Sequence, residues 1–69
     1  MKSVSGKKLC RIVKKKGWVL KRVKGSHHIY AHPVHRNILT IPVHGKKDLK
    51  IGILRSLMRI AQLTEDDLV

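Results

Sequence analysis

Apolar residues near the start of the chain recur with the spacing of an amphipathic helix. Leu9 and Val13 lie four residues apart, and lysine and arginine side chains occupy most of the positions around them. Ser5 is a suitable N-cap for such a helix, and Gly17 can end it in the left-handed conformation that glycine adopts easily. The pattern therefore predicts a helix over residues 5–16.

Three short segments rich in strand-forming residues come next. They cover residues 18–23, 27–32 and 38–43, and turns over residues 24–26 and 34–37 separate them. Because such short turns connect strands that lie side by side, they favour antiparallel hairpins.

Helical spacing returns near the C-terminus and predicts a second helix over residues 50–62. Thr64, with Asp67 three residues later, resembles the start of a final short helical turn. The order is α-β-β-β-α, an α+β fold in which two helices cover one face of a three-stranded antiparallel sheet and the other face is left for function. The apolar stripe of the second helix consists of Ile53, Leu54, Leu57, Met58 and Ala61.

The length of the chain allows one domain, residues 1–69. A chain of this size buries only about 60% of the surface that it exposes when unfolded, so the core is thin and a large organic cofactor has no room. We expect Trp18, Met58 and Cys10 in this core and no cofactor.

The alternation of side chains along the second strand gives a further expectation. Ile29 and Ala31 look inward-facing, which places His27 on the inner face with them. His28 and Tyr30 then face solvent, where a tyrosine can stack on a base. A residue at the start of a strand need not follow the alternation, so both histidines remain candidates for the working side chain.

The charge of the chain points to a polyanionic partner. Sixteen Lys and Arg residues oppose four acidic ones, a net charge of +12, and residues 1–47 contain no carboxylate side chain. A surface that served only solubility would mix both signs. A membrane-surface helix would need a strong apolar face and aromatic anchors, so we expect nucleic acid and no membrane.

The cysteine content points to a reducing compartment. Cys10 is the single cysteine, so an internal disulfide cannot form in a small domain that would profit from one. The first residues contain no apolar run of the kind found in a signal peptide. We expect a cytoplasmic protein.

Five histidines crowd the middle of the chain, and a metal site is the first interpretation to consider. His28 and His32 would stand about 13 Å apart on one strand, too far to share an ion. Asp48 is the only carboxylate outside the C-terminal tail, and zinc or two-metal sites need three or four ligands. We expect no metal, and we interpret His32, His35 and His44 as polar surface or phosphate contacts.

Acid–base catalysis is the second interpretation. Without paired carboxylates, histidine is the natural proton carrier, and RNA is the suitable substrate because its 2′-OH can attack the adjacent phosphate. The Gly25-Ser26 turn before His27 and His28 permits close approach of a phosphate, whose oxygens can accept from backbone N–H groups and the serine hydroxyl.

Residues spaced along nearly the whole chain, up to Leu63, resemble the HicA toxin family. The Gly-Ser-His motif alone is weak, whereas the spaced set is fairly specific. One departure is Ile51, where the family often has a proline that favours the start of a helix. The matching residues are Gly17-Trp18, Arg22, Gly25-Ser26-His27, Tyr30, His32-Pro33, Ile41-Pro42-Val43-His44, Lys47-Asp48-Leu49-Lys50 and Leu54-Arg55.

The resemblance implies the toxin half of a type II toxin–antitoxin pair. Such toxins are metal-independent ribonucleases that cleave mRNA and inhibit translation, and they share a fold similar to double-stranded-RNA-binding domains. The resemblance implies a HicB antitoxin as the partner and His27 as the catalytic histidine, with His28 as the runner-up. The residues expected to hold phosphates are Arg22, Lys24, Gly25, Ser26, Lys46, Lys47 and Lys50.

The alternative function is a binding module without chemistry. Lys46, Lys47 and Lys50 precede the second predicted helix, and double-stranded-RNA-binding domains grip phosphates with lysines in a similar place. The sequence leaves this alternative open.

Overall fold

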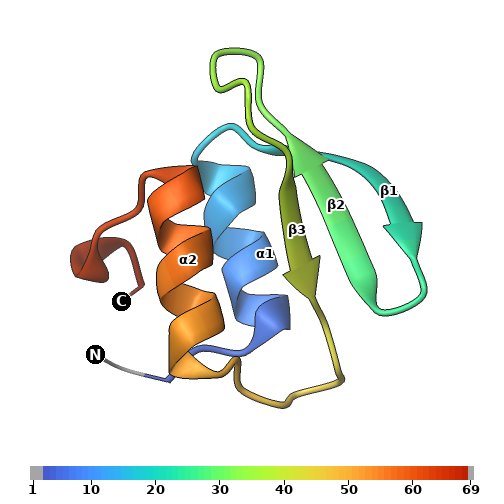
Figure 1. Ribbon diagram of the computed structural model, residues 1–69, viewed down its shortest axis with the longest axis vertical. Helices are drawn as coiled ribbons and strands as arrows, with labels where there is room; N and C mark the ends of the chain where they lie inside the picture. Colours follow the sequence, from blue (N-terminus) through green and yellow to red (C-terminus); the bar gives the residue numbers. More distant parts are fainter. Residues whose placement is uncertain (1–2, 69) are drawn as a thin grey trace.

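The computed structural model describes residues 3–68, and its element order confirms the predicted α-β-β-β-α fold. The three strands form one antiparallel sheet in the order β1-β2-β3, and both helices lie on the same side of it (Figure 1). Within residues 3–68, the opposite face of the sheet carries no helix (Figure 1). In chain order the elements are α1 (Gly6–Lys15), β1 (Val19–Lys24), β2 (His27–Ala31), β3 (Leu39–Pro42), α2 (Ile51–Ala61) and the short 3-10 helix η1 (Glu65–Leu68).

Helix α1 begins and ends at the residues that the sequence indicates. The Ser5 hydroxyl accepts a hydrogen bond from the Lys8 N–H at 3.1 Å, as an N-cap does. Gly17 has a φ of 95° and turns the chain away from the helix, just after the C-cap residue Lys16. The predicted range of residues 5–16 thus includes one cap at each end.

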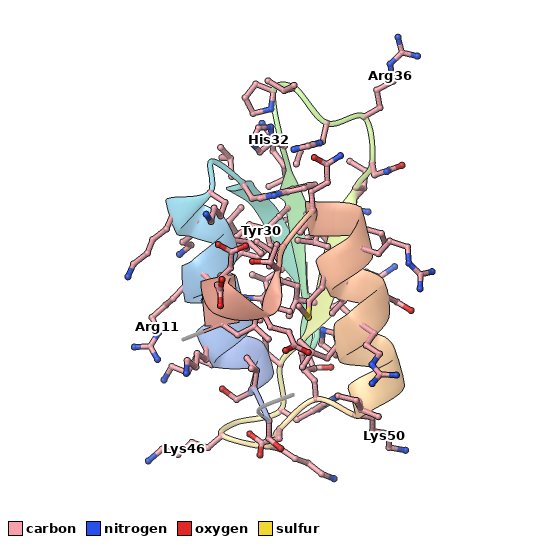
Figure 2. All side chains as sticks on the ribbon, turned by 90° about the vertical axis from the view of Figure 1, so that its left-hand side faces the viewer. Arg11, Tyr30, His32, Arg36, Lys46 and Lys50 are labelled. Atoms are coloured by element: carbon pink, nitrogen blue, oxygen red, sulfur yellow. The ribbon has the colours of Figure 1, made fainter. Side chains whose placement is uncertain are left out.

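The orientation of β2 is the reverse of the one expected from the sequence. Tyr30 is 1% exposed and lies between the sheet and the helices, whereas Ile29 and Ala31 are partly exposed on the other face (Figure 2). Tyr30 pairs across the sheet with the fully buried Leu39, so the register of β2 against β3 directs its large ring into the core. The isolated strand pattern could not show which of its faces the helices would cover.

Strand β1 lies at one edge of the sheet, and the helices do not cover it. All six of its residues are exposed, and its ladder with β2 is interrupted between Leu20 and Arg22 by a bulge. The strand starts one residue later than predicted because Trp18 turns into the core, where it is 2% exposed. Cys10 and Met58 are also buried, as expected.

Helix α2 buries a narrower stripe than the sequence suggests. Leu54, Leu57, Met58 and Ala61 are buried, but Ile53, which helical spacing assigned to the same apolar stripe, is 42% exposed. The C-terminal turn follows the prediction, since a hydrogen bond from the N–H of Thr64 to the Asp67 carboxylate opens η1. No helix within residues 3–68 is long and apolar enough to cross a membrane.

Candidate active site

His27 is the first residue of β2 and lies on the open face of the sheet. Its cross-strand partners are Lys24 on β1 and Pro42 on β3. Because Tyr30 points to the helices, the alternation of the strand directs His27 and Ile29 to the opposite side. His27 is exposed there, with a lysine as its direct neighbour.

Arg22 adds a second cation to the same face. It pairs with Ile29, which follows His27 as the next residue of β2 on the open face. Residues that face each other in a ladder share one face, so Arg22 and Lys24 flank the imidazole. None of the three strands contains a carboxylate to offset these charges, and the face suits a phosphate backbone.

His28 points the other way. It pairs with Val23 and with the buried Ile41, so its side chain lies on the helix side of the sheet, where it is half-buried. The alternation argument that put His28 on the solvent side is therefore wrong. Of the two candidate histidines, His27 is the one accessible from the open face.

The turn between β1 and β2 is held in place by β3. Gly25 has a φ of 59°, a conformation that glycine adopts at little cost. The carbonyl of Ser26 accepts a 2.7 Å hydrogen bond from the N–H of Val43, directly after the last residue of β3. The Gly-Ser turn thus sits beside the end of β3, where a phosphate near His27 can reach its backbone.

The segment after β3 brings the predicted lysines to the same end of the molecule as this turn (Figure 1). It is anchored by a 2.8 Å hydrogen bond from the N–H of Leu49 to the carbonyl of Val4. Figure 2 shows Lys46 and Lys50 at this end, on different sides of it. The molecule therefore presents the lysines in two directions.

These lysines line two different hollows. Lys47 and Lys50 line a hollow together with Pro42 and His44, between the end of β3 and the first turn of α2. Lys46 lines a different hollow, with cations of α1. In the sequence these lysines form one run. In the structure, only Lys47 and Lys50 lie beside Pro42, the cross-strand partner of His27.

His32 and His35 belong to a cluster around Trp18 at the opposite end of the molecule. The His35 ring stacks on Trp18 with 5.4 Å between centroids, and His32 meets both rings edge-on. Figure 2 shows His32 at the far end from Lys46 and Lys50. The interpretation of these two histidines as phosphate contacts is not supported, because their rings pack against a core residue.

Hydrogen bonds fix the tautomer of His32. Its Nδ1 accepts from the N–H of Val34 at 3.0 Å, so the ring proton lies on Nε2, which donates to the carbonyl of Lys16 at 3.1 Å. The neutral ring thereby ties the end of α1 to the loop after β2. The indole N–H of Trp18 beside it is buried without a partner among the described residues, an arrangement that costs about 1–3 kcal/mol.

The aromatic side chains are not available for base stacking. Trp18 and Tyr30 are the only aromatic residues of the types Phe, Trp and Tyr in the chain, and both are buried. Burial raises the pKa of Tyr30, and the neighbouring Cys10 thiol adds to this rise, so the phenol stays neutral. Trp18 is in the core, as expected, the stacking role considered for Tyr30 is wrong, and the open face offers charge and hydrogen bonds to a ligand.

The chemistry that the open face offers is that of imidazole, ammonium and guanidinium groups. Within residues 3–68, no group of three or more His, Cys, Asp or Glu side chains is arranged to hold a metal ion. His27 and His44 are the exposed histidines, and both lie near the cationic turn and hollow. Imidazoles among cations are suited to proton transfer at an anionic substrate.

Comparison with known families identifies the family of the chain. A family model described as the HicA toxin of bacterial toxin–antitoxin systems matches residues 6–63, from the start of α1 to the residue before Thr64. A comparison with individual curated proteins gives no match. The family match covers most of the 69 residues, including every element except η1. The chain therefore belongs to the HicA toxin family of bacterial toxin–antitoxin systems.

Proposed function

We propose that this toxin is an endoribonuclease that cleaves mRNA with His27 as its proton-transferring residue and so inhibits translation. The observation that carries the proposal is the position of His27, exposed on the uncovered face of the sheet and paired with Lys24. Arg22 on the same face supplies a second cation. Bound RNA would thus lay its phosphates beside an imidazole.

The proposed reaction uses the nucleophile that RNA itself carries. His27 accepts the proton of a 2′-OH, and the resulting oxygen attacks the adjacent phosphorus. Negative charge on the phosphoryl oxygens is stabilised by Arg22, by Lys24 and by the backbone of Gly25 and Ser26. No protein carboxylate or metal-bound water is required for this step, which fits the side chains on this face.

The proposed partner in the complex is an antitoxin of the HicB type. The toxin carries a net charge of +12, so a complementary surface on the partner would be acidic. We place it over the open face, where it would cover His27 and exclude RNA. An mRNA substrate and a reduced lone cysteine both imply that the toxin acts in the cytoplasm.

The test is a purified transcript incubated with the purified toxin in EDTA. We expect cleavage, with a 2′,3′-cyclic phosphate on the product, and no cleavage at a position where the 2′-OH is replaced by hydrogen. The antitoxin complex should leave the transcript intact. Cleavage that requires added metal, or that continues at the 2′-deoxy position, would overturn the proposed chemistry.

The second function is an RNA-binding module without catalysis. Lys46 with the cations of α1, and Lys47 with Lys50, form basic surfaces on both sides of one end of the molecule. These surfaces can hold phosphates across a groove without any chemistry. The same gel decides between the two functions, because a binding module retards the transcript and leaves it at full length.

A further inference from the structure

We propose that His44 is a second catalytic residue, the general acid that protonates the leaving 5′-oxygen. This inference rests on the proposed ribonuclease activity and adds a partner to His27. A strand cleavage by 2′-OH attack needs two proton transfers, one from the nucleophile and one to the leaving group. The structure supplies a histidine for each.

His44 lies two residues after the end of β3, and extending the alternation of that strand assigns it to the open face. The hydrogen bond between the N–H of Val43 and the carbonyl of Ser26 continues the pairing beyond Pro42. Val43 packs against the core, and the alternation of β3, extended past its last residue Pro42, assigns Pro42 and His44 to the opposite side. Pro42 is the cross-strand partner of His27, and both histidines therefore border the same proline.

The spacing is suitable for a phosphate between the two rings. Same-side residues of a strand are about 7 Å apart, and paired residues of neighbouring strands are about 5 Å apart. His27 pairs with Pro42 across the sheet, and His44 lies two residues after Pro42, past the end of β3, so one step of each kind gives their approximate separation. Two imidazoles on one face at this separation can reach opposite sides of a single phosphodiester.

No other pair of histidines in the described part of the chain has these properties. His28 faces the helices, and His32 and His35 are engaged with Trp18. His27 and His44 are exposed and appear in none of the hydrogen bonds or ring contacts within residues 3–68. Their rings are thus free to meet a substrate.

The surroundings of His44 favour an anionic substrate. Its hollow is lined by Lys47 and Lys50, with Asp48 as the one carboxylate. On the strand side the charged neighbour is Lys24, which pairs with His27. Helix α2 begins at this hollow without a side-chain cap, so its first N–H groups add partial positive charge toward the same place.

The proposed step is balanced without a further reactant. His27 takes the proton of the 2′-OH, the 2′-oxygen forms a bond to phosphorus, and the bond from phosphorus to the 5′-oxygen breaks. The imidazolium of His44 gives its proton to that 5′-oxygen. The products are a 2′,3′-cyclic phosphate and a 5′-hydroxyl, with the cation on His27 instead of His44.

The test compares an ordinary RNA with one whose scissile 5′-oxygen is replaced by sulfur. A thiolate leaves without protonation, so this substrate needs no general acid. We expect His44→Ala to slow cleavage of the ordinary RNA by about 100-fold or more. On the 5′-thio substrate, we expect a loss of less than about 10-fold, because the step that His44 serves is bypassed.

Three variants serve as controls in the same assay. His44→Gln should show the same selective rescue, which guards against a loss of fold in the alanine variant. His27→Ala should remain slow on both substrates, since the base is needed in each. Lys47→Ala, on the wall of the same hollow, should weaken both reactions by the same factor because it affects only binding.

The outcomes are separable. If His44→Ala and His44→Gln are slowed equally on both substrates, or cleave ordinary RNA as fast as the parent, His44 is not the acid while the ribonuclease stands. If the sulfur substrate rescues His27→Ala instead, the two roles are reversed and the assignment is wrong. If the parent cleaves neither substrate, the proposed function fails and the role of His44 falls with it.

Discussion

The five histidines of this chain differ in role because the backbone places each ring differently. His32 accepts from one backbone N–H and donates to one carbonyl, so it is held as a neutral, structural ring. His27 stands exposed on the open face, and His44 is exposed beside the hollow that Lys47 and Lys50 line. The sequence alone left His27 and His28 as the two catalytic candidates, and strand pairing with burial separates them.

Gly17 is required where α1 ends, because of both its backbone and its neighbour. Its φ of 95° is unfavourable for other residues, and a Cβ there would lie 2.8 Å from the Nε2 of His32. We expect Gly17→Ala to lower the free energy of unfolding by at least about 1 kcal/mol.

Gly52 provides the matched control, because its Cβ would meet open space on α2. Gly52→Ala should be neutral or should stabilise the protein by up to about 1 kcal/mol. Urea unfolding of the two variants measures both effects. Equal stabilities for the two would contradict the account of the Gly17 turn.

Asp67 makes the stability of the C-terminal turn depend on pH. The Lys16 ammonium at 2.8 Å and the N–H of Thr64 hold the pKa of this carboxyl below its ordinary value. Because the folded pKa is the lower one, the charged carboxylate stabilises the fold above the ordinary Asp pKa of about 3.9. This contribution is lost as the pH falls through the folded pKa.

We therefore expect the melting temperature of the parent to fall more steeply below about pH 4 than that of Asp67→Asn. Asp66→Asn, a change at the exposed neighbouring carboxylate, should follow the parent. Thermal unfolding followed by circular dichroism at a series of pH values checks this. Parallel curves for all three proteins would show that the Lys16 pair contributes nothing.

At the scale of elements, β1 is held by one neighbour only. It pairs with β2, its residues are all exposed, and the helices pack on β3 instead. Its bulge also interrupts the ladder. We expect the amides of β1 to exchange with solvent deuterium faster than those of β2 that bond to β3, because local opening of an uncovered edge strand costs little.

Hydrogen exchange followed by NMR measures this order for the free protein. Binding of an antitoxin or RNA over the open face should slow exchange in β1, since the same face carries Arg22 and Lys24. Protection of β1 in the free protein equal to that of β3 would contradict the picture of an uncovered edge.

The elements themselves could be predicted from local patterns, but their orientation could not. Helical spacing and the residues Ser5, Gly17 and Thr64 gave the helices and turns within about a residue, because caps and turns are local interactions. The facing of β2 depended on its register with β3, which brings Tyr30 against Leu39. Such a pairing lies between segments, beyond the reach of alternation within one strand.

The candidate site was likewise predictable in part. The tight turn at Gly25 and Ser26 and the start of the next strand at His27 were predictable, since a turn and its following residue are local in sequence. The run of lysines looked continuous, yet Lys46 lies toward α1, and Lys47 lies toward the end of β3 and the start of α2. The outward position of His44 required the hydrogen bond of Val43 to Ser26, which joins two segments.

At the scale of the whole molecule, the net charge of +12 dominates the encounter with RNA. We expect affinity to fall with salt in a linear log–log relation, because bound lysines and arginines displace counterions from the phosphates. Lys47→Ala should reduce the magnitude of that slope by about one if Lys47 contacts a phosphate.

Glu65→Gln raises the net charge by one unit and thus separates local contact from overall charge. Glu65 belongs to η1, which lies on the helix side, away from the open face (Figure 1). The slope of log affinity against log salt concentration for Glu65→Gln should equal that of the parent. Filter binding of a noncleavable 2′-O-methyl RNA at several salt concentrations measures the slopes, and a parental slope for Lys47→Ala would remove Lys47 from the binding surface.

The central claim is that His27 on the open face moves the protons of RNA cleavage. The most direct measurement is the single-turnover rate of transcript cleavage in EDTA for the parent, His27→Ala and His28→Gln, with RNA affinity measured alongside. We predict a loss of at least about 100-fold for His27→Ala at nearly unchanged affinity, and a rate close to that of the parent for His28→Gln. A His27→Ala variant that cleaves as fast as the parent would contradict the account.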